Sequence, residues 1–174
     1  MKLYLVRHGE KEKDEFSSNL TTFGKEQIKK LAETLTDKNI KKIYSSSNPR
    51  SIQTGEIIGN KINLPVTIVK SIQELPREVF FQPERELSQQ NQEMLRSIHL
   101  FLNEISKRDE DVVLAMHAGI NRATISLLLD IPLQKMVHFT QDLSCMNLLE
   151  FKEMYGEKRW CLDLLNSTHH LNDK

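Results

Sequence analysis

MKLYLVRHGE, residues 1–10, is the stretch that decides the fold. Its apolar run from Leu3 to Val6 predicts a buried strand, which leads directly into Arg7, His8 and Gly9. Gly9 is expected to let the backbone turn sharply. In open α/β sheets the functional crevice lies at the carboxyl ends of the strands. The stretch therefore predicts a site at the rim of a sheet, where His8 is held and Arg7 can bind an anion such as phosphate.

A second strand that ends in polar residues is predicted at Ile40–Tyr44. Serines follow it, and Pro49 suits the first turn of a helix, where a missing N–H costs nothing. Arg50 then lies in that turn, near the carboxyl end of the strand. If the two strands are neighbours, Arg50 and His8 share one layer; otherwise Arg50 is a solvated surface residue.

A third strand, DVVLAM at Asp111–Met116, repeats the pattern of the first. It ends in His117, Ala118 and a glycine, and a helix is predicted from about Ile120 to Leu129. Free N–H groups at a helix start favour an anion. We therefore expect His117 and this helix start to face the same anion as His8.

The remaining periodicity completes an α/β pattern in which strands and helices alternate. A helix with its N-cap at Thr21 or Thr22 follows the first loop, and residues 71–82 are expected to be irregular. The other predicted elements are a strand at Val66–Val69, a helix at Glu84–Lys107, a strand at Ser144–Phe151 and a final hairpin strand at Arg159–Leu165.

Charge and composition restrict the classes of partner. The chain has 174 residues, with 24 basic and 24 acidic side chains. We expect a single domain over residues 1–174, with a frayed polar tail from about 167 to 174. No basic patch indicates nucleic acid, and the apolar run at the N-terminus is too short for a signal peptide or a membrane span. A cytoplasmic protein without nucleic-acid or membrane partners is expected, and its oligomeric state is not encoded in any pattern that we recognise.

The cysteine pattern gives no sign of a metal site. Cys145 and Cys161 lie in separate apolar runs without C-x-x-C spacing, so we expect buried free thiols rather than a disulfide or a zinc site. The rest of the sequence contains no cluster with metal-ligand spacing.

Three motifs in order resemble the histidine phosphatase superfamily, which has the phosphoglycerate mutase-like fold. They are Arg-His-Gly, then Ser-Ser with an arginine five residues after the first serine and a following Gln-Thr, and last a strand that ends in histidine before small residues. The resemblance implies a three-layer α/β/α sandwich with a mostly parallel central sheet and an antiparallel edge strand. The matching positions are Arg7, His8, Gly9, Leu20, Thr21, Gly24, Gln27, Ser45, Ser46, Arg50, Gln53, Thr54, His117, Ala118, Gly119 and the late strand DLSCMNLLEF.

The resemblance also implies a mechanism without metal or cofactor. His8 would attack phosphorus as the neutral imidazole, with its other ring N–H donating to a backbone carbonyl. Arg7 and Arg50 would neutralise the transferring phosphoryl group, and His117 would be protonated beside the dianion. Arg7, His8, Arg50, His117 and Ala118 would form the substrate site.

The family also needs a carboxylic acid, which protonates the leaving group and then activates water. Ile72-Gln73-Glu74 resembles the usual Leu-x-Glu, which makes Glu74 the candidate, with Glu78 as its rival and a plain loop carboxylate as the alternative. The sequence departs from the family in the stretch after Glu74, LPREVFF, and at Ser51 and Gly55, where alanine is usual.

The resemblance implies that mutases of the family carry longer insertions, so the short chain and the short segment 10–20 favour hydrolysis over mutase chemistry. The leading hypothesis is a metal-independent phosphatase acting on a small phosphomonoester. The alternatives are a protein phosphohistidine phosphatase acting on a phosphoprotein, a metal-independent phosphoglycerate-type mutase, and a catalytically weak phosphate-binding regulatory protein. Specificity is expected from segments 10–20, 71–92 and 134–143, in which Phe80, Phe81 and Phe139 form either an apolar wall or part of the core.

Overall fold

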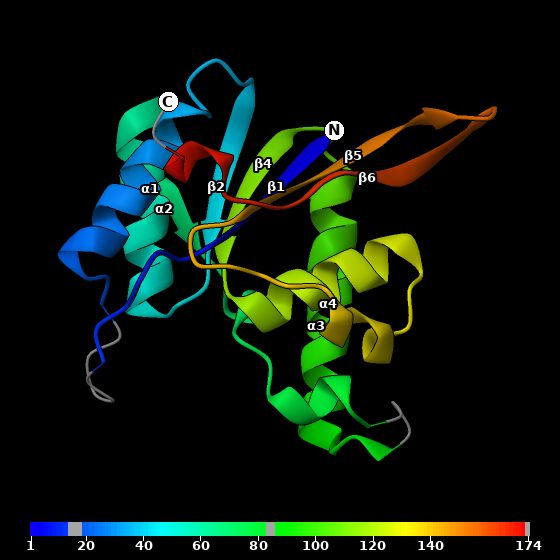
Figure 1. The fold of residues 1–174 in the computed structure, drawn as a ribbon. Helices are drawn as coiled ribbons and strands as arrows, with labels where there is room; N and C mark the ends of the chain where they lie inside the picture. The colour runs from blue at the N-terminus through cyan, green and yellow to red at the C-terminus, as the bar shows by residue number, and fades with distance from the viewer. Residues whose placement is uncertain (14–18, 83–85, 173–174) are drawn as a thin grey trace.

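The structure is a computed structural model that describes residues 1–13, 19–82 and 86–172 (Figure 1). At its centre lies a six-stranded sheet in the order β3-β2-β4-β1-β5-β6. The strands are β1 (Lys2–Arg7), β2 (Ile40–Ser45), β3 (Val66–Ile68), β4 (Asp111–Met116), β5 (Met146–Met154) and β6 (Glu157–Ser167). The α-helices are α1 (Thr22–Glu33), α2 (Pro49–Ile62), α3 (Gln89–Ser106) and α4 (Ala118–Leu129). Short 3-10 helices are η1 (Lys70–Ile72), η2 (Arg77–Phe80), η4 (Leu133–His138) and η5 (His169–Leu171).

The sheet is parallel from β3 to β1 and antiparallel beyond it. Strand β4 pairs in parallel with both β1 and β2, so that Ala115 lies beside Val6 on one side and beside Ser45 on the other. Strand β5 runs antiparallel to β1 and forms a hairpin with β6. This arrangement confirms the predicted fold class, and it brings the carboxyl ends of β1, β4 and β2 to one edge of the sheet.

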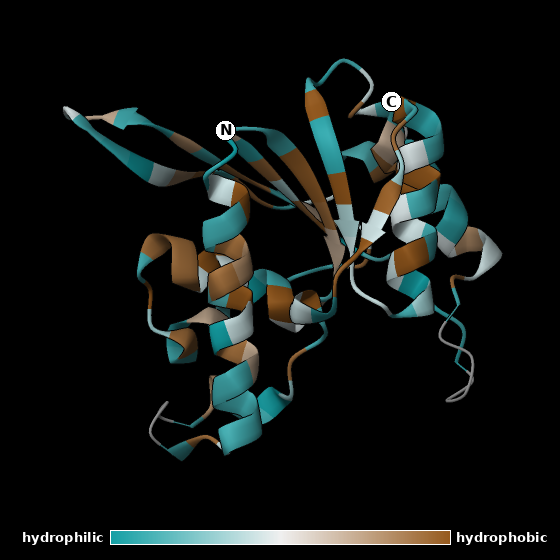
Figure 2. Cartoon of the chain, turned by 180° about the vertical axis from the view of Figure 1, so that it is seen from behind, coloured by the Kyte–Doolittle hydropathy of each residue, from teal (hydrophilic) through white to brown (hydrophobic). Residues whose placement is uncertain are grey.

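Helices cover both faces of the sheet, with α1 and α2 on one side and α3 and α4 on the other (Figure 1). Strand β1 contributes to both cores because its side chains alternate. Leu3 and Leu5 belong to the cluster shared with α3 and α4, whereas Tyr4 and Val6 belong to the cluster shared with α1 and α2. The helices mix hydrophobic and hydrophilic residues, as expected of helices with one buried face (Figure 2).

The start of α3 corrects one sequence prediction. The periodicity of Leu87 and Leu95 predicts a helix from Glu84, but α3 begins at Gln89. Ser88 is the N-cap, and its side chain accepts a hydrogen bond from the backbone N–H of Asn91. Leu87 is still buried, from a position outside the helix, and residues 83–85 lie outside the described part of the chain.

The described part of the C-terminal tail has regular structure, where the sequence predicts a frayed tail from about residue 167. Ser167 is the last residue of β6, and η5 follows it and packs against α1. The ring Nε2 of His170 lies 3.0 Å from the hydroxyl of Ser144. Polar residues are therefore held here by a specific contact, and only residues 173–174 lie outside the description.

The two cysteines differ in their surroundings. Both are free thiols, as predicted. Cys145 is buried at the edge of the sheet, and burial raises the pKa of its thiol to about 12. Cys161 is only partly buried on the hairpin strand β6, beside Met154, so the prediction that it is buried is wrong. The hairpin of β5 and β6 extends beyond the helical layers (Figure 1).

The loop after β1 and the start of α1 approach each other through two glycines. A Cβ atom on Gly9 would overlap the carbonyl oxygen of Gly24, and a Cβ atom on Gly24 would overlap that of Glu10. Gly9 does not have a positive φ. The requirement for glycine here comes from close backbone contact rather than from the sharp turn that the sequence suggests.

We predict that Gly24→Ala lowers the free energy of unfolding by about 2 kcal/mol or more, because the new methyl group must push backbone apart. Urea denaturation followed by circular dichroism measures the change. Lys25→Ala is the matched control, since Lys25 is exposed on the same helix. Equal stability of the two variants would contradict the proposed close contact.

Candidate active site

Three strand ends supply the predicted site residues. His8 follows β1, Arg50 lies in the first turn of α2 after β2, and His117 is the N-cap of α4 after β4. Strands β1 and β2 are not neighbours, as β4 lies between them. The site is nevertheless assembled, because β4 places His117 in the middle: its ring centroid is 5.3 Å from that of His8.

His8 is held in one orientation and kept neutral. Its Nδ1 lies 2.7 Å from the carbonyl oxygen of Gly9, so Nδ1–H donates there and Nε2 keeps its lone pair. Burial lowers the pKa of His8 to about 3, and the positive charges of Arg50 and Arg7 act in the same direction. This is the tautomer and the charge that a nucleophilic imidazole requires.

His117 is fully buried against two hydroxyl groups. Its Nε2 lies 2.8 Å from Oγ of Ser46 and 3.1 Å from Oγ of Ser51, while Nδ1 has no hydrogen-bond partner. Burial lowers the pKa of His117 to about 2, with further contributions from His8 and Arg50. The protein's own groups therefore keep His117 neutral, and the protonated form predicted from the sequence requires the charge of a bound dianion.

The two arginines are positioned by hydrogen bonds at one end of each guanidinium. Arg7 donates through NH1 to the backbone carbonyl of Gln141, and Arg50 donates through NH1 to Oδ1 of Asn48 at 2.8 Å. The Nε atoms of both arginines are buried and have no partner. In the described part of the chain, five buried side-chain atoms lack a partner, and three of them belong to Arg7, Arg50 and His117. Such unpaired polar atoms are costly unless a ligand binds them, so their concentration at one place indicates a polar ligand site.

Glu74 lies between η1 and η2 and reaches the start of α4. Its Oε1 accepts hydrogen bonds from the backbone N–H groups of Gly119 at 2.9 Å, Ile120 at 3.3 Å and Leu75 at 3.1 Å. Two N–H groups of the helix start that we expect to face a phosphate thus bind this carboxylate. Burial raises the pKa of Glu74, although these three hydrogen bonds and the charge of Arg50 oppose the shift. Its rival Glu78 is exposed on η2.

A pocket of about 530 Å³ opens beside Glu74. Phe80 and Phe81 line it, but Phe139 instead packs against the core. The predicted site residues Arg7, Glu74 and Ala118 all contribute to it. The lining residues are Arg7, Glu74, Leu75, Arg77, Phe80, Phe81, Ala118, Gly119, Arg122, Val137 and Gln141.

Sequence reasoning missed two supports of the site. Ser51 was identified only as a departure from a family alanine, although its hydroxyl contacts His117. The other is Gln141, whose side chain forms a buried amide network: its Oε1 accepts from Asn121 at 3.0 Å and from Asn147 at 2.8 Å. This network fixes the backbone carbonyl that binds Arg7. A serine in the first turn of α2 is a local signal, whereas nothing near position 141 in the sequence indicates a contact with residue 7.

Comparison with protein families gives a match to the model of the histidine phosphatase superfamily (branch 1), over residues 3–99 and 80–167. The chain belongs to this superfamily. Comparison with proteins of curated function found no match.

Solved structures with the same fold cover nearly the whole chain. The alpha-ribazole phosphatase from Shigella flexneri has a TM-score of 0.76 at 22% identity and covers 97% of each chain. A phosphoserine phosphatase mutant from Entamoeba histolytica, solved in complex with phosphoserine, has a TM-score of 0.76 at 20% identity and covers 98% of this chain and 99% of that one. A mycobacterial glucosyl-3-phosphoglycerate phosphatase has a TM-score of 0.76 at 18% identity, with 95% and 99% covered. At these identities the likeness establishes that the chain shares the fold of these histidine phosphatases.

The described residues contain no group of three or more histidine, cysteine, aspartate or glutamate side chains that could hold a metal ion. None of the described helices is long and apolar enough to span a membrane.

Because His8 and His117 are buried, we predict that the free energy of unfolding falls in acid. The pKa of each falls from 6.5 to about 3 for His8 and about 2 for His117. Below pH 6.5 the unfolded chain binds protons that the folded chain does not, so stability rises with pH across this window and is lost on acidification. Each histidine should lower the free energy of unfolding by about 2 kcal/mol between about pH 7.5 and about pH 5.

Urea denaturation at these two pH values tests the prediction with the variant His8→Gln. Its loss of stability on acidification should be about 2 kcal/mol smaller than that of the parent protein. His99→Gln, which changes an exposed histidine on α3, is the control and should behave like the parent. An identical pH dependence for parent and His8→Gln would show that His8 is not held neutral by the fold.

Proposed function

We propose that the protein is a phosphatase that hydrolyses small phosphomonoesters through a phosphohistidine intermediate on His8. The observation that carries this proposal is the set of unpaired buried nitrogens beside the ring of His8, namely Nε of Arg7, Nε of Arg50 and Nδ1 of His117. A phosphoryl group offers three peripheral oxygens, which are strong acceptors for these donors. When the hydroxyl of Ser46 or Ser51 donates to Nε2 of His117, Nδ1 carries the proton that a phosphate oxygen would accept.

In the first step, Nε2 of His8 attacks phosphorus and the bond to the ester oxygen breaks. Arg7 and Arg50 stabilise the charge on the equatorial oxygens, which is the main requirement of phosphoryl transfer. Glu74 gives its proton to the departing alkoxide. The raised pKa of Glu74 supports this role, because burial favours the protonated acid.

In the second step, Glu74 acts as a carboxylate and takes a proton from water. The water oxygen attacks phosphorus, the bond between phosphorus and His8 breaks, and inorganic phosphate leaves. The charge that a metal would supply in other phosphatases is provided here by guanidinium groups, so this scheme requires no metal ion.

The relatives support hydrolysis of small molecules. The three structures described above are phosphatases by name, and one of them was solved with phosphoserine. The pocket beside Glu74 is of a size that suits a small leaving group. A screen of phosphorylated metabolites and a phosphohistidine peptide separates this proposal from its alternative. Turnover of the peptide alone would favour a protein phosphohistidine phosphatase.

Replacement of the nucleophile tests the reaction class. We predict that His8→Ala lowers kcat for p-nitrophenyl phosphate on the order of a thousandfold or more, because no other group can form the covalent intermediate. The parent should stay active in excess chelator, and rapid denaturation at alkaline pH should trap a phosphoenzyme that is stable in base and labile in acid. His99→Ala is the control, as it removes an exposed histidine. A His8→Ala variant as active as the parent would refute the nucleophile, and activity lost on chelation would refute the metal-independent scheme.

The leaving group tests the acid. The phenolate of an aryl phosphate departs with little help from a proton, whereas the alkoxide of an alkyl phosphate needs one. We therefore predict that Glu74→Gln slows an alkyl ester at least tenfold more than an aryl ester. General acid catalysis contributes about 10²–10⁴-fold to such reactions, which sets the expected size of the effect. Values of kcat for both esters measure the difference. Glu78→Gln is the matched control and should affect both esters equally. Equal effects of Glu74→Gln on the two esters would argue against Glu74 as proton donor.

A further inference from the structure

The hydrogen bond that orients His8 depends on a peptide group in the loop after β1. Nδ1 of His8 lies 2.7 Å from the carbonyl oxygen of Gly9. That carbonyl and the N–H of Glu10 belong to one planar peptide group, in which they point in opposite directions. Any contact that fixes the N–H of Glu10 therefore also fixes the acceptor for the proton of His8.

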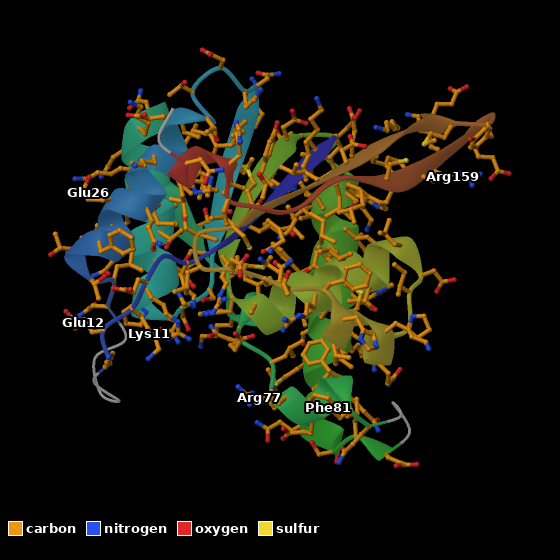
Figure 3. The ribbon with its side chains drawn as sticks, viewed as in Figure 1. Lys11, Glu12, Glu26, Arg77, Phe81 and Arg159 are labelled. Atoms are coloured by element: carbon orange, nitrogen blue, oxygen red, sulfur yellow. The ribbon has the colours of Figure 1, made fainter. Side chains whose placement is uncertain are left out.

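A side chain from α1 binds the N–H of Glu10. This N–H donates to Oε1 of Gln27 at 2.9 Å. Because the donor is a backbone N–H, the amide of Gln27 presents its oxygen here. Gln27 is buried, whereas the preceding Glu26 is exposed and points away from the sheet on the outer side of α1 (Figure 3). The amide oxygen of a buried side chain thus holds this peptide group.

The backbone of His8 itself is held by other backbone atoms. Its N–H donates to the carbonyl of Met116 on β4 at 3.1 Å, and its carbonyl accepts from the N–H of Ser144 at 3.0 Å. A side-chain substitution removes neither partner. The peptide group after Gly9 is instead bound by a side chain, so its orientation depends on the residue at position 27.

Gly9 makes this peptide group easy to rotate, because a glycine has no Cβ that resists a change of its backbone angles. Rotation would turn the carbonyl of Gly9 away from the ring of His8, and a larger rotation would bring the N–H of Glu10 toward the ring. The position of the proton on an imidazole follows the hydrogen bond that the ring makes. A ring that faces an N–H accepts through Nδ1 and carries its proton on Nε2.

The tautomer with its proton on Nε2 cannot act in the proposed mechanism. Attack on phosphorus uses the lone pair of Nε2, and a proton on that nitrogen occupies the pair. Burial keeps the ring of His8 uncharged by lowering its pKa to about 3, but both tautomers are uncharged, so burial does not select between them. The selection therefore comes from the hydrogen bond at Nδ1.

We propose that Gln27 is a positioning residue that selects the reactive tautomer of His8. By accepting the N–H of Glu10, it holds the carbonyl of Gly9 toward Nδ1 of His8 and so leaves the lone pair on Nε2. The inference rests on the proposed function, because it assigns what keeps the proposed nucleophile ready to attack. It places this control in α1, a helix that contributes no group to the reaction steps.

Gln27→Met tests the inference, because methionine is similar to glutamine in length and bulk but has no amide oxygen. NMR of protein with isotope-labelled histidine nitrogens distinguishes the two tautomers, and His8→Gln identifies the signals of His8. The parent should carry the proton on Nδ1, whereas Gln27→Met should show the form with the proton on Nε2. We expect kcat for p-nitrophenyl phosphate to fall about tenfold, the effect of removing the acceptor of a partly buried N–H. The inhibition constant of inorganic phosphate should change little, because both arginines remain.

Gln53→Met is the matched control. Oε1 of Gln53 also accepts from a backbone N–H, that of Leu20 at 2.7 Å, so this variant loses the same kind of hydrogen bond at a different peptide group. It should keep the parent's tautomer and a kcat close to the parent's. Gln27→Glu retains an acceptor oxygen and should also keep the tautomer, so a change as large as that in Gln27→Met would count against the hydrogen bond.

The tautomer separates positioning from a merely structural role. A Gln27→Met protein that keeps its proton on Nδ1 of His8 would overturn the inference whatever its kcat, since a general loss of stability lowers activity without moving this proton. If a thermal melt shows that Gln27→Met is unfolded, Gln27→Asn, whose shorter side chain draws the oxygen back, is measured by the same criteria. A parent that hydrolyses no ester would refute the phosphatase function, and the tautomer of His8 would still decide the role of Gln27.

Discussion

The parallel pairing of β4 between β1 and β2 is the constraint on which the site depends. Because the three strands run in one direction, their last residues meet at one edge, and each strand delivers a polar group there. His117, at the end of the central strand, lies beside His8 and between the two arginine-bearing ends. A strand inserted between β4 and β1 would separate the histidine rings by at least the width of one more strand.

Desolvation then determines what these groups can do. The same burial that keeps both imidazoles neutral also leaves nitrogens of Arg7, Arg50 and His117 without partners. Unpaired buried donors and an acid-sensitive fold are costs to stability, and they are concentrated where an anion would relieve them. The hydroxyls at Ser46 and Ser51 and the amide network behind Gln141 hold these donors in place. The rest of the sheet, with its two apolar cores, supplies the stability that offsets these costs.

The fold could be predicted where the sequence signal is local. The predicted bounds of β4 match the structure because a continuous apolar run ends abruptly in His117. Helix α2 begins at Pro49, a position where the missing N–H of proline costs nothing. The predicted start of α3 is wrong because hydrophobic periodicity continues through Leu87, whereas the helix begins only after the cap at Ser88. In the site, Glu74 could not be separated from Glu78 by spacing alone, since the difference lies in contacts with α4, which is some 45 residues away in the sequence. Gln141 was missed for the same reason, as its neighbours in space are distant in the chain.

The way in which Glu74 is held has a consequence for how such a protein can diversify. Its Oε1 is bound to backbone N–H groups of Gly119 and Ile120, which are present whatever side chains α4 carries. The pocket wall at residues 77–81 begins only three positions later. Mutations that reshape this wall therefore leave the Glu74 carboxyl in register with its helix. Under the proposed function, a lineage can exchange one leaving group for another through this short segment while the chemistry beside it is inherited unchanged.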